Sequence, residues 1–161
     1  MTLEWLTGVG GWIGVGLGFA LQAAGAPVPS VLLFPALAAL GEHTRVPWWI
    51  SGGVAGVSVA CGHLLSYAVF TILGQPLLTR LTERTPALRR PTQRVRHLLA
   101  QGRSWLPLLG LRWLGTGYSQ VFWLLGTMQV LPAMLLGSLF LNDLVWALAW
   151  AYAWTALTGK F

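Results

Sequence analysis

Charged side chains are scarce in this sequence of 161 residues, and acidic side chains are the scarcest. Asp and Glu together number four, and charged residues of both signs make up 9% of the chain. Neither a charged residue nor a histidine occurs between Trp5 and Gly41, and residues 105–159 contain two charged residues, Arg112 and Asp143. Soluble domains carry about 25% charged residues, which help to cover their surface. The composition therefore argues against a soluble domain and predicts an integral membrane protein.

Other absences narrow the range of functions. The single cysteine, Cys61, excludes an internal disulfide, and its apolar surroundings predict a small buried packing residue. The sequence has no Gly-x-Ser-x-Gly, phosphate-loop or His-Glu-x-x-His motif, so we do not expect an enzyme. The three histidines, His43, His63 and His97, are too widely spaced to suggest a metal site, and we expect no cofactor. The first residues lack the basic region of a secretory signal, so the apolar start is expected to be retained.

Positive charge is concentrated in one segment. Seven arginines lie there, opposed by Glu83: Arg80, Arg84, Arg89, Arg90, Arg94, Arg96 and Arg103. A short arginine-rich loop of a membrane protein faces the cytoplasm, and its charges also attract anionic lipid headgroups. Aromatic residues, on which bases stack, do not interleave these arginines, so we do not expect nucleic-acid binding.

The first apolar block is interrupted at a proline-rich turn. Pro27 and Pro29, which follow Gly25, remove backbone donors and prevent one continuous helix. The two arms, Val9–Gly25 and Ser30–Gly41, are each shorter than the roughly 20 residues that span a bilayer. We therefore expect a broken or re-entrant helix here. The next block, from about Trp48 to Leu73, is long enough to span.

The second half of the sequence repeats this order. An arm from Trp105 to Leu114 is interrupted at Gly115 and Gly117, and another arm runs from Tyr118 to about Met128. A last spanning candidate extends from Met134 to about Leu157. Interrupted segments in corresponding halves are typical of transporters with inverted repeats. We expect an all-α membrane bundle of one domain, residues 1–161, with halves at about 8–74 and 105–161 joined by a basic cytoplasmic loop at about 75–104.

The order of several short motifs resembles the DedA family, which carries the SNARE-associated Golgi protein domain. Its turn motif, Gly-x-Pro-x-Pro, matches residues 25–29, and the family's next motif is matched by Gly62, His63, Tyr67 and Gly74. A later arginine motif is matched by Gly102 and by Arg112 through Tyr118. The last features of the family pattern are echoed by Leu125, Gly126, Asn142 and Trp146. The likeness covers nearly the whole chain from about Leu21.

The sequence departs from the family pattern at its charged positions. Gln22 and Val31 stand where the family has acidic residues around the first turn. His63 replaces an aspartate, and Tyr118 replaces the second arginine of the later motif, while Arg112 keeps the first. The resemblance implies flipping of lipids such as polyprenyl phosphates, coupled to proton or ion gradients. The missing acids argue against proton coupling in this chain.

Five residues are candidates for substrate binding: Arg112, Gln22, Tyr118, His63 and Tyr67. Arg112, before the second break, can pair with a lipid phosphate or extend to the membrane interface without a substrate. Gln22 can bind a headgroup or a freed backbone carbonyl, and His63 can relay protons or remain neutral and hydrogen-bonded. The two tyrosines can instead anchor the interface or satisfy a buried hydrogen bond. Asp143, with Asn142, can cap the last helix or pair with Arg112.

Two functions follow from these observations. The first is a transporter that moves the headgroup of a phospholipid or a polyprenyl phosphate across the bilayer. The second is a non-transporting membrane scaffold that keeps the DedA fold without its acidic machinery. For either function we expect a multi-pass protein of a cell membrane, typically a bacterial inner membrane. We expect lipids, including anionic ones, as partners, and the sequence leaves open whether the protein forms a homo-oligomer.

Overall fold

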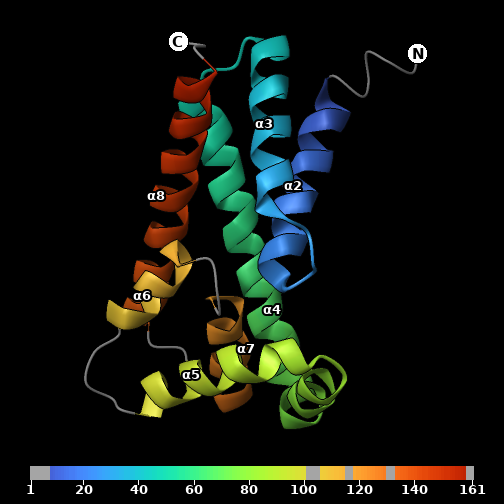
Figure 1. Ribbon diagram of the computed structural model, residues 1–161, viewed down its shortest axis with the longest axis vertical. Helices are drawn as coiled ribbons and strands as arrows, with labels where there is room; N and C mark the ends of the chain where they lie inside the picture. Colours follow the sequence, from blue (N-terminus) through green and yellow to red (C-terminus); the bar gives the residue numbers. More distant parts are fainter. Residues whose placement is uncertain (1–7, 101–105, 115–117, 130–132, 159–161) are drawn as a thin grey trace. The chain divides into compact units, whose positions relative to one another are not determined.

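The computed structural model describes residues 8–100, 106–114, 118–129 and 133–158, and these ranges contain helices and turns without a strand (Figure 1). The helices are α2 (Val9–Ala24), α3 (Ser30–Thr44), α4 (Trp48–Arg84), η1 (Pro86–Leu88), α5 (Arg89–Ala100), α6 (Leu106–Trp113), α7 (Tyr118–Met128) and α8 (Ala133–Leu157). The all-α class predicted from the sequence is confirmed.

The chain forms two compact units. Unit 1 comprises residues 1–62 and 143–161, and unit 2 comprises residues 63–142, so the division falls within α4 and within α8. The single domain and its two sequential halves stay a prediction.

Unit 1 contains the first interrupted segment. Gly25 ends α2 with a φ of 103°, a left-handed conformation that glycine adopts without steric cost. Its N–H donates to the Gln22 carbonyl (3.1 Å), and the Ala26 N–H donates to the Leu21 carbonyl (2.9 Å), as is common at helix C-termini. The next helix, α3, begins after Pro29 and packs alongside α2 (Figure 1). Residues 25–29 are thus non-helical, where the sequence predicted a break.

Aromatic side chains form the core of unit 1. Phe34 of α3 lies edge-on to Phe19 of α2, with ring centroids 5.0 Å apart, and edge-on to Trp146 of α8 at 5.3 Å. Glycines bring the helix backbones together around this core. A Cβ atom on Gly56 of α4 would lie 3.1 Å from the backbone of Leu144 in α8. Gly56 therefore serves the close packing of α4 against α8.

Helix α4 contains a kink at the end of its apolar part. Gly74 has a φ of 53° and a ψ of −148°, a combination that is essentially restricted to glycine. Pro76 follows, within the first turn of the continuing helix, where a missing N–H costs little. Past the kink, segment 75–104, expected as a basic loop, is helical through the end of α4, η1 and α5, with residues 101–104 outside the described ranges.

Unit 2 encloses a second core, in which α5 packs against α6 and α7. Val95 of α5 is buried in this core together with Leu78 of α4, while Leu98 and Leu99 cover its edge. The arginines of α5 remain exposed, so α5 is amphipathic. Helix α7 lies at the centre of this core, and eight of its residues are buried: Tyr118, Gln120, Val121, Phe122, Trp123, Leu124, Leu125 and Gly126.

Many large apolar side chains are exposed on both units. On α2, Val9, Ile13, Leu17 and Leu21 recur every four residues and form one exposed stripe. Cys61, expected to be buried, is also exposed on α4. By length and composition, one helix among the described residues can cross a bilayer, and it is α4. Helix α2 is apolar but shorter.

Candidate functional site

Three of the five candidate residues lie together in unit 2, around Tyr118. We call this group the Tyr118 cluster, and it comprises His63, Arg112, Trp113, Tyr118, Phe122 and Asn142. The imidazole of His63 stacks on the ring of Phe122, with centroids 4.2 Å apart and planes 3° from parallel. The Tyr118 ring stands edge-on to both, at 5.2 Å from His63 and 5.7 Å from Phe122. His63 and Tyr118 are both buried.

Arg112 adds a buried positive charge to the cluster. Its guanidinium carbon lies 5.4 Å from the centroid of the Tyr118 ring, within the range of a cation–π interaction. The side chain is only 6% exposed, so Arg112 does not extend into solvent. Burying a guanidinium is costly unless other groups interact with it, and an aromatic face is one such group. Tyr118 is thus a direct neighbour of Arg112 in this cluster.

Asn142 of α8 connects the cluster to its surroundings. Its amide nitrogen donates to the Leu109 carbonyl at 3.0 Å and to the Tyr118 hydroxyl at 3.3 Å. Its amide oxygen accepts from the indole nitrogen of Trp113 at 3.0 Å. The Tyr118 hydroxyl in turn donates to the carbonyl of Leu139 (3.3 Å). The sequence suggested a helix cap as a role of Asn142 with Asp143, but Asn142 lies inside α8 and its partners are remote in sequence.

The cluster combines groups that suit an anionic headgroup. A guanidinium offers a planar set of donors that matches two phosphate oxygens. Tyr118 and His63 add polar atoms within an aromatic wall, where the low dielectric strengthens a charge–charge interaction.

The remaining candidate residues lie outside the cluster. Tyr67 is half-buried against the core of unit 2, and its carbonyl accepts from the Thr71 hydroxyl at 2.8 Å. Gln22 belongs to unit 1, where its side-chain oxygen is buried and accepts no hydrogen bond from the described residues. Of the predicted helix-break residues, Gly25, Pro27 and Pro29 lie in the turn described above. Gly102, Gly115 and Gly117 lie outside the described residues.

Asp143 is fully buried and lies inside α8, which begins at Ala133, so the helix-cap role that the sequence suggested for it is wrong. It is assigned to unit 1 and Arg112 to unit 2, so their expected ion pair stays a prediction. In the part of the chain that the structure describes, His, Cys, Asp and Glu residues do not form a group of three that could hold a metal ion.

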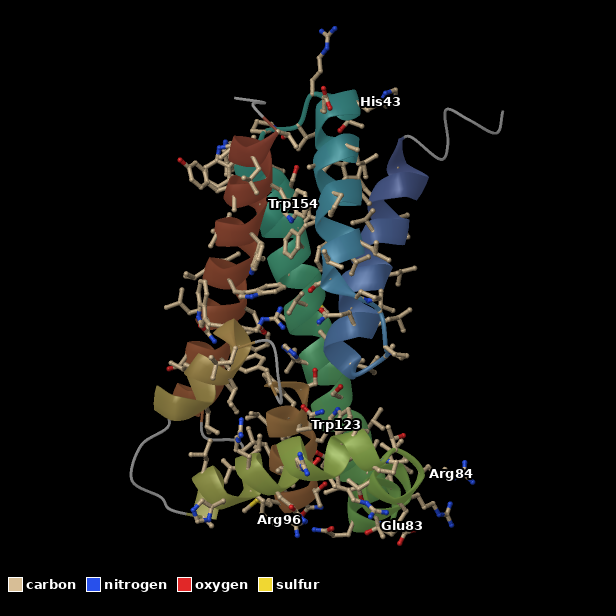
Figure 2. The ribbon with its side chains drawn as sticks, in the orientation of Figure 1. His43, Glu83, Arg84, Arg96, Trp123 and Trp154 are labelled. Atoms are coloured by element: carbon tan, nitrogen blue, oxygen red, sulfur yellow. The ribbon has the colours of Figure 1, made fainter. Side chains whose placement is uncertain are left out.

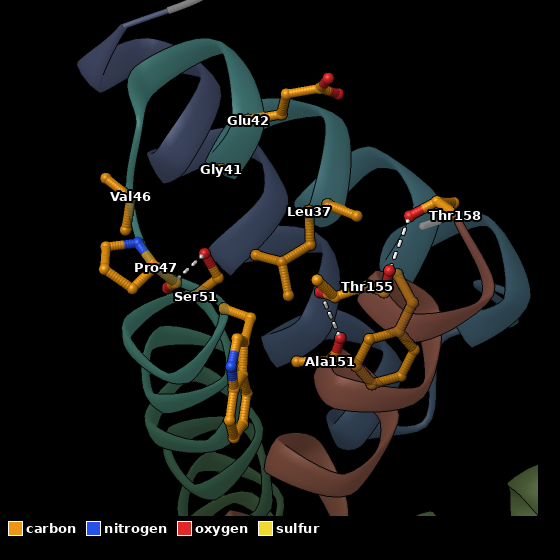
Figure 3. A pocket seen from close by; sticks show the side chains of 12 residues that line it. Leu37, Gly41, Glu42, Val46, Pro47, Ser51, Ala151, Thr155 and Thr158 are labelled. Atoms are coloured by element: carbon orange, nitrogen blue, oxygen red, sulfur yellow. Dashed lines mark hydrogen bonds between the residues drawn. The ribbon is translucent and has the colours of Figure 1, made fainter. Parts of the chain in front are cut away.

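Unit 1 contains a cavity of about 530 Å³ that the sequence did not reveal (Figure 3). It lies between the end of α3, the start of α4 and the end of α8, and Phe34, Leu37 and Trp48 are among its lining residues. Its hydroxyl groups donate to carbonyls nearby in the sequence: Ser51 to Pro47 at 3.3 Å, Thr155 to Ala151 at 2.8 Å and Thr158 to Trp154 at 2.9 Å. The cavity therefore offers a largely apolar wall, with the carboxylate of Glu42 among its lining groups. The small residues Gly41, Ser51 and Ala151 are among its lining residues.

Comparisons with known proteins add no relative: no family model, curated protein or solved structure matches the chain. The likeness to the DedA family stays a prediction from the motifs in the sequence.

Proposed function

We propose that this chain is a multi-pass membrane protein that transports the anionic headgroup of a lipid across the bilayer, with Arg112 of the Tyr118 cluster as the headgroup-binding cation. The observation that carries the proposal is the burial of this guanidinium against Tyr118 in a chain with so few charges. An ionised side chain inside a membrane protein is expensive and is most often retained for function.

The exposed apolar surface supports the membrane part of the proposal. Ile72 on α4 is 82% exposed, and the stripe on α2 continues from Val9 to Leu21. Exposed apolar patches of this kind need a covering, and lipid tails supply one. Helix α4 is long and apolar enough to span. The exposed arginines of α5 and of the end of α4 would then face the cytoplasm, by the positive-inside rule.

The interrupted helices support the transport part. Helices α2 and α3 are separated by the turn at residues 25–29, and α6 ends at Trp113 before α7 begins at Tyr118. Paired broken helices are the arrangement that inverted-repeat transporters use to expose a central site alternately to each side. Under the proposal, both interrupted segments re-enter the membrane as a DedA-like inverted repeat. The substrate is a phospholipid or a polyprenyl phosphate.

The mechanism follows from the cost of moving a phosphate through hydrocarbon. The buried guanidinium of Arg112 would hold two phosphate oxygens during the crossing, so that the headgroup is never without a counter-charge. Tyr118 would keep the guanidinium in place through the face of its ring, because the tyrosine hydroxyl is already fixed by Leu139 and Asn142. Lipid tails would remain in the bilayer beside the exposed faces of the helices.

A liposome assay tests the proposal. Purified protein is reconstituted into vesicles containing phosphatidylglycerol with a fluorescent acyl chain, and flipping is followed by chemical quenching of the outer leaflet. We expect Arg112→Gln to lower the flipping rate at least tenfold, because the headgroup loses its counter-charge. The matched control is Arg94→Gln, which removes an exposed arginine of α5 and should change the rate less than twofold. Equal rates in empty and protein-containing vesicles would rule the transport function out.

The hydrogen bonds of Asn142 favour a second candidate, the non-transporting membrane scaffold. They link α8 to residues of α6 and α7, and such links suit a rigid structure better than a moving one. A scaffold would tolerate Arg112→Gln in cells and would co-purify with partner proteins in mild detergent. If Arg112→Gln is expressed at the normal level but no longer supports the cellular function of the wild-type protein, the scaffold hypothesis is ruled out.

A further inference from the structure

A smaller cavity in unit 2, of about 280 Å³, lies where the end of α4 faces α5. It shares no residue with the Tyr118 cluster. Its lining is mostly polar, with two arginines, three threonines and two glutamines around one leucine: Gln75, Leu78, Thr79, Thr82, Arg89, Thr92, Gln93 and Arg96. We call it the α4–α5 pocket. Pockets for drug-sized ligands occupy roughly 300–1,000 Å³, so this volume suits a smaller group.

The charge of the α4–α5 pocket is purely positive. Arg89 and Arg96 line it, and no acidic residue does. Glu83, the acidic residue nearest in sequence, is exposed and is absent from the lining, and Figure 2 shows it with Arg84 and Arg96 at the surface of this unit. A polar cavity with this lining therefore favours an anion over a cation or a neutral ligand.

One of the two arginines is already fixed in position. The Nε atom of Arg89 donates to the carbonyl of Thr82 at 3.0 Å. That carbonyl lies in the last turn of α4, where the helix provides no N–H partner of its own. This hydrogen bond places the guanidinium at the pocket and leaves its terminal nitrogens as further donors.

A buried hydroxyl in the pocket has no protein partner. Thr92 of α5 is 5% exposed, and its Oγ1 atom makes no hydrogen bond to the described residues. The nearby Thr82 hydroxyl differs, because it donates to the carbonyls of Leu78 and Thr79 at 3.0 Å each. Buried polar atoms are almost always hydrogen-bonded, and an exception needs an explanation. A ligand in the pocket that Thr92 lines would supply the missing partner.

We propose that the α4–α5 pocket binds a phosphoryl group. The guanidinium groups of Arg89 and Arg96 can each bind phosphate oxygens through paired N–H donors. The Thr92 hydroxyl and the amide of Gln93 can donate to the remaining oxygens. The pocket thus offers several hydrogen-bond donors and has no acidic side chain in its lining. This set suits a phosphate better than a carboxylate, because a carboxylate has only two oxygens to accept hydrogen bonds. Free phosphate and the headgroup of an anionic phospholipid both present this chemistry.

Binding to the full-length protein in an uncharged detergent tests the proposal. Radiolabelled inorganic phosphate is titrated by equilibrium dialysis, and water-soluble dihexanoyl phosphatidic acid is titrated in parallel by isothermal calorimetry. We expect saturable binding of at least one of the two. Binding of the lipid alone identifies a headgroup site, and binding of phosphate alone identifies a site for the free ion. Either result supports the pocket, and the absence of saturable binding to both overturns it.

Matched variants separate the pocket from general attraction to basic residues. Arg96→Gln should weaken binding at least tenfold, whereas Arg94→Gln, which removes an exposed arginine of the same helix outside the lining, should change it less than twofold. Thr92→Val should weaken binding several-fold, and Thr92→Ser should retain it. Equal losses in the two arginine variants, or unchanged binding in Thr92→Val, would refute the proposal. If Arg96→Gln fails to fold, the two Thr92 variants decide.

This proposal does not depend on lipid transport. Binding is measured without flipping, and none of the substituted residues belongs to the Tyr118 cluster. A protein that binds phosphate at the pocket but does not flip lipid would refute the proposed function alone. A protein that flips lipid but binds neither probe would refute the α4–α5 pocket alone.

Discussion

Asn142 uses both ends of its side-chain amide in hydrogen bonds that join residues of three helices. The partners are Leu109 and Trp113 of α6 and Tyr118 of α7, with distances of 3.0–3.3 Å. Removing the amide takes a hydrogen-bond partner from three groups: the Leu109 carbonyl, the Trp113 indole N–H and the Tyr118 hydroxyl. A donor or acceptor left unsatisfied in a buried site costs about 1–3 kcal/mol, and less where water can reach it.

Substituting Asn142 therefore provides a test of the Tyr118 cluster. Because Asn142 is half-buried, we expect Asn142→Ala to lower the free energy of unfolding by about 1–2 kcal/mol. Thermal unfolding in detergent micelles, followed by circular dichroism, measures the change. Thr155→Val is the control, since the Thr155 hydroxyl donates to the Ala151 carbonyl of its own helix, and we expect little change. Equal stability of the two variants would contradict a structural role for Asn142.

Single residues were predictable where their chemistry was unusual for their surroundings. Arg112 stood out as a charge between apolar arms, and the structure places it, with Tyr118 and His63, in one cluster. The role of Asn142 was not predictable, because its partners lie 24 to 33 residues away in the sequence. The buried Thr92 hydroxyl without a hydrogen-bond partner was likewise not predictable from the sequence, because the burial of one threonine depends on how α4 and α5 pack.

Contacts between helices depend on two glycines, Gly62 and Gly126, both named above as positions of short motifs in the sequence. A Cβ atom on Gly62 of α4 would collide with the backbone carbonyl of Ala20 in α2, and one on Gly126 of α7 would collide with that of Tyr67 in α4. Backbone atoms cannot move aside as a flexible side chain can. By contrast, a Cβ atom on Gly53 of α4 would meet nothing within 4 Å.

Two alanine substitutions in α4 test these helix contacts. We expect Gly62→Ala to destabilise the protein by about 1–3 kcal/mol, the usual cost of forcing extra volume into a packed site. Gly53→Ala should be neutral or stabilising by up to about 1 kcal/mol, because alanine favours helix over glycine. Thermal unfolding in the same detergent, without urea, compares the stability of the two variants. A stable Gly62→Ala variant would contradict the close approach of α2 and α4.

Helix boundaries were predictable because they depend on local chemistry. Gly25 and the prolines after it end one helix and start the next, and the kink in α4 falls at Gly74, where the apolar block ends. The basic segment was expected as a loop, but α4 continues to Arg84 and α5 follows. Its amphipathic side packs Val95 into the core of unit 2, a tertiary contact that stabilises the helix.

At the scale of the whole molecule, the exposed apolar surface predicts how the protein behaves in a cell. The stripe on α2 and the exposed side chains of α4 need lipid or detergent around them. We expect the protein to stay in the membrane pellet after washing with alkaline carbonate and to dissolve only when detergent is added. Immunoblotting of both fractions measures this, with a peripheral membrane protein as the control. Release by carbonate alone would contradict a membrane-spanning chain.

The sequence by itself determined the all-α class, the interrupted first segment and the location of the rare charges, because helix propensity, proline geometry and hydropathy act over a few residues. The tertiary structure decided which side chains meet. The ring of Tyr118 beside the Arg112 guanidinium, the amide of Asn142 between three helices and the α4–α5 pocket all join residues from separate segments. Such contacts depend on the packing of whole helices, which local patterns do not specify.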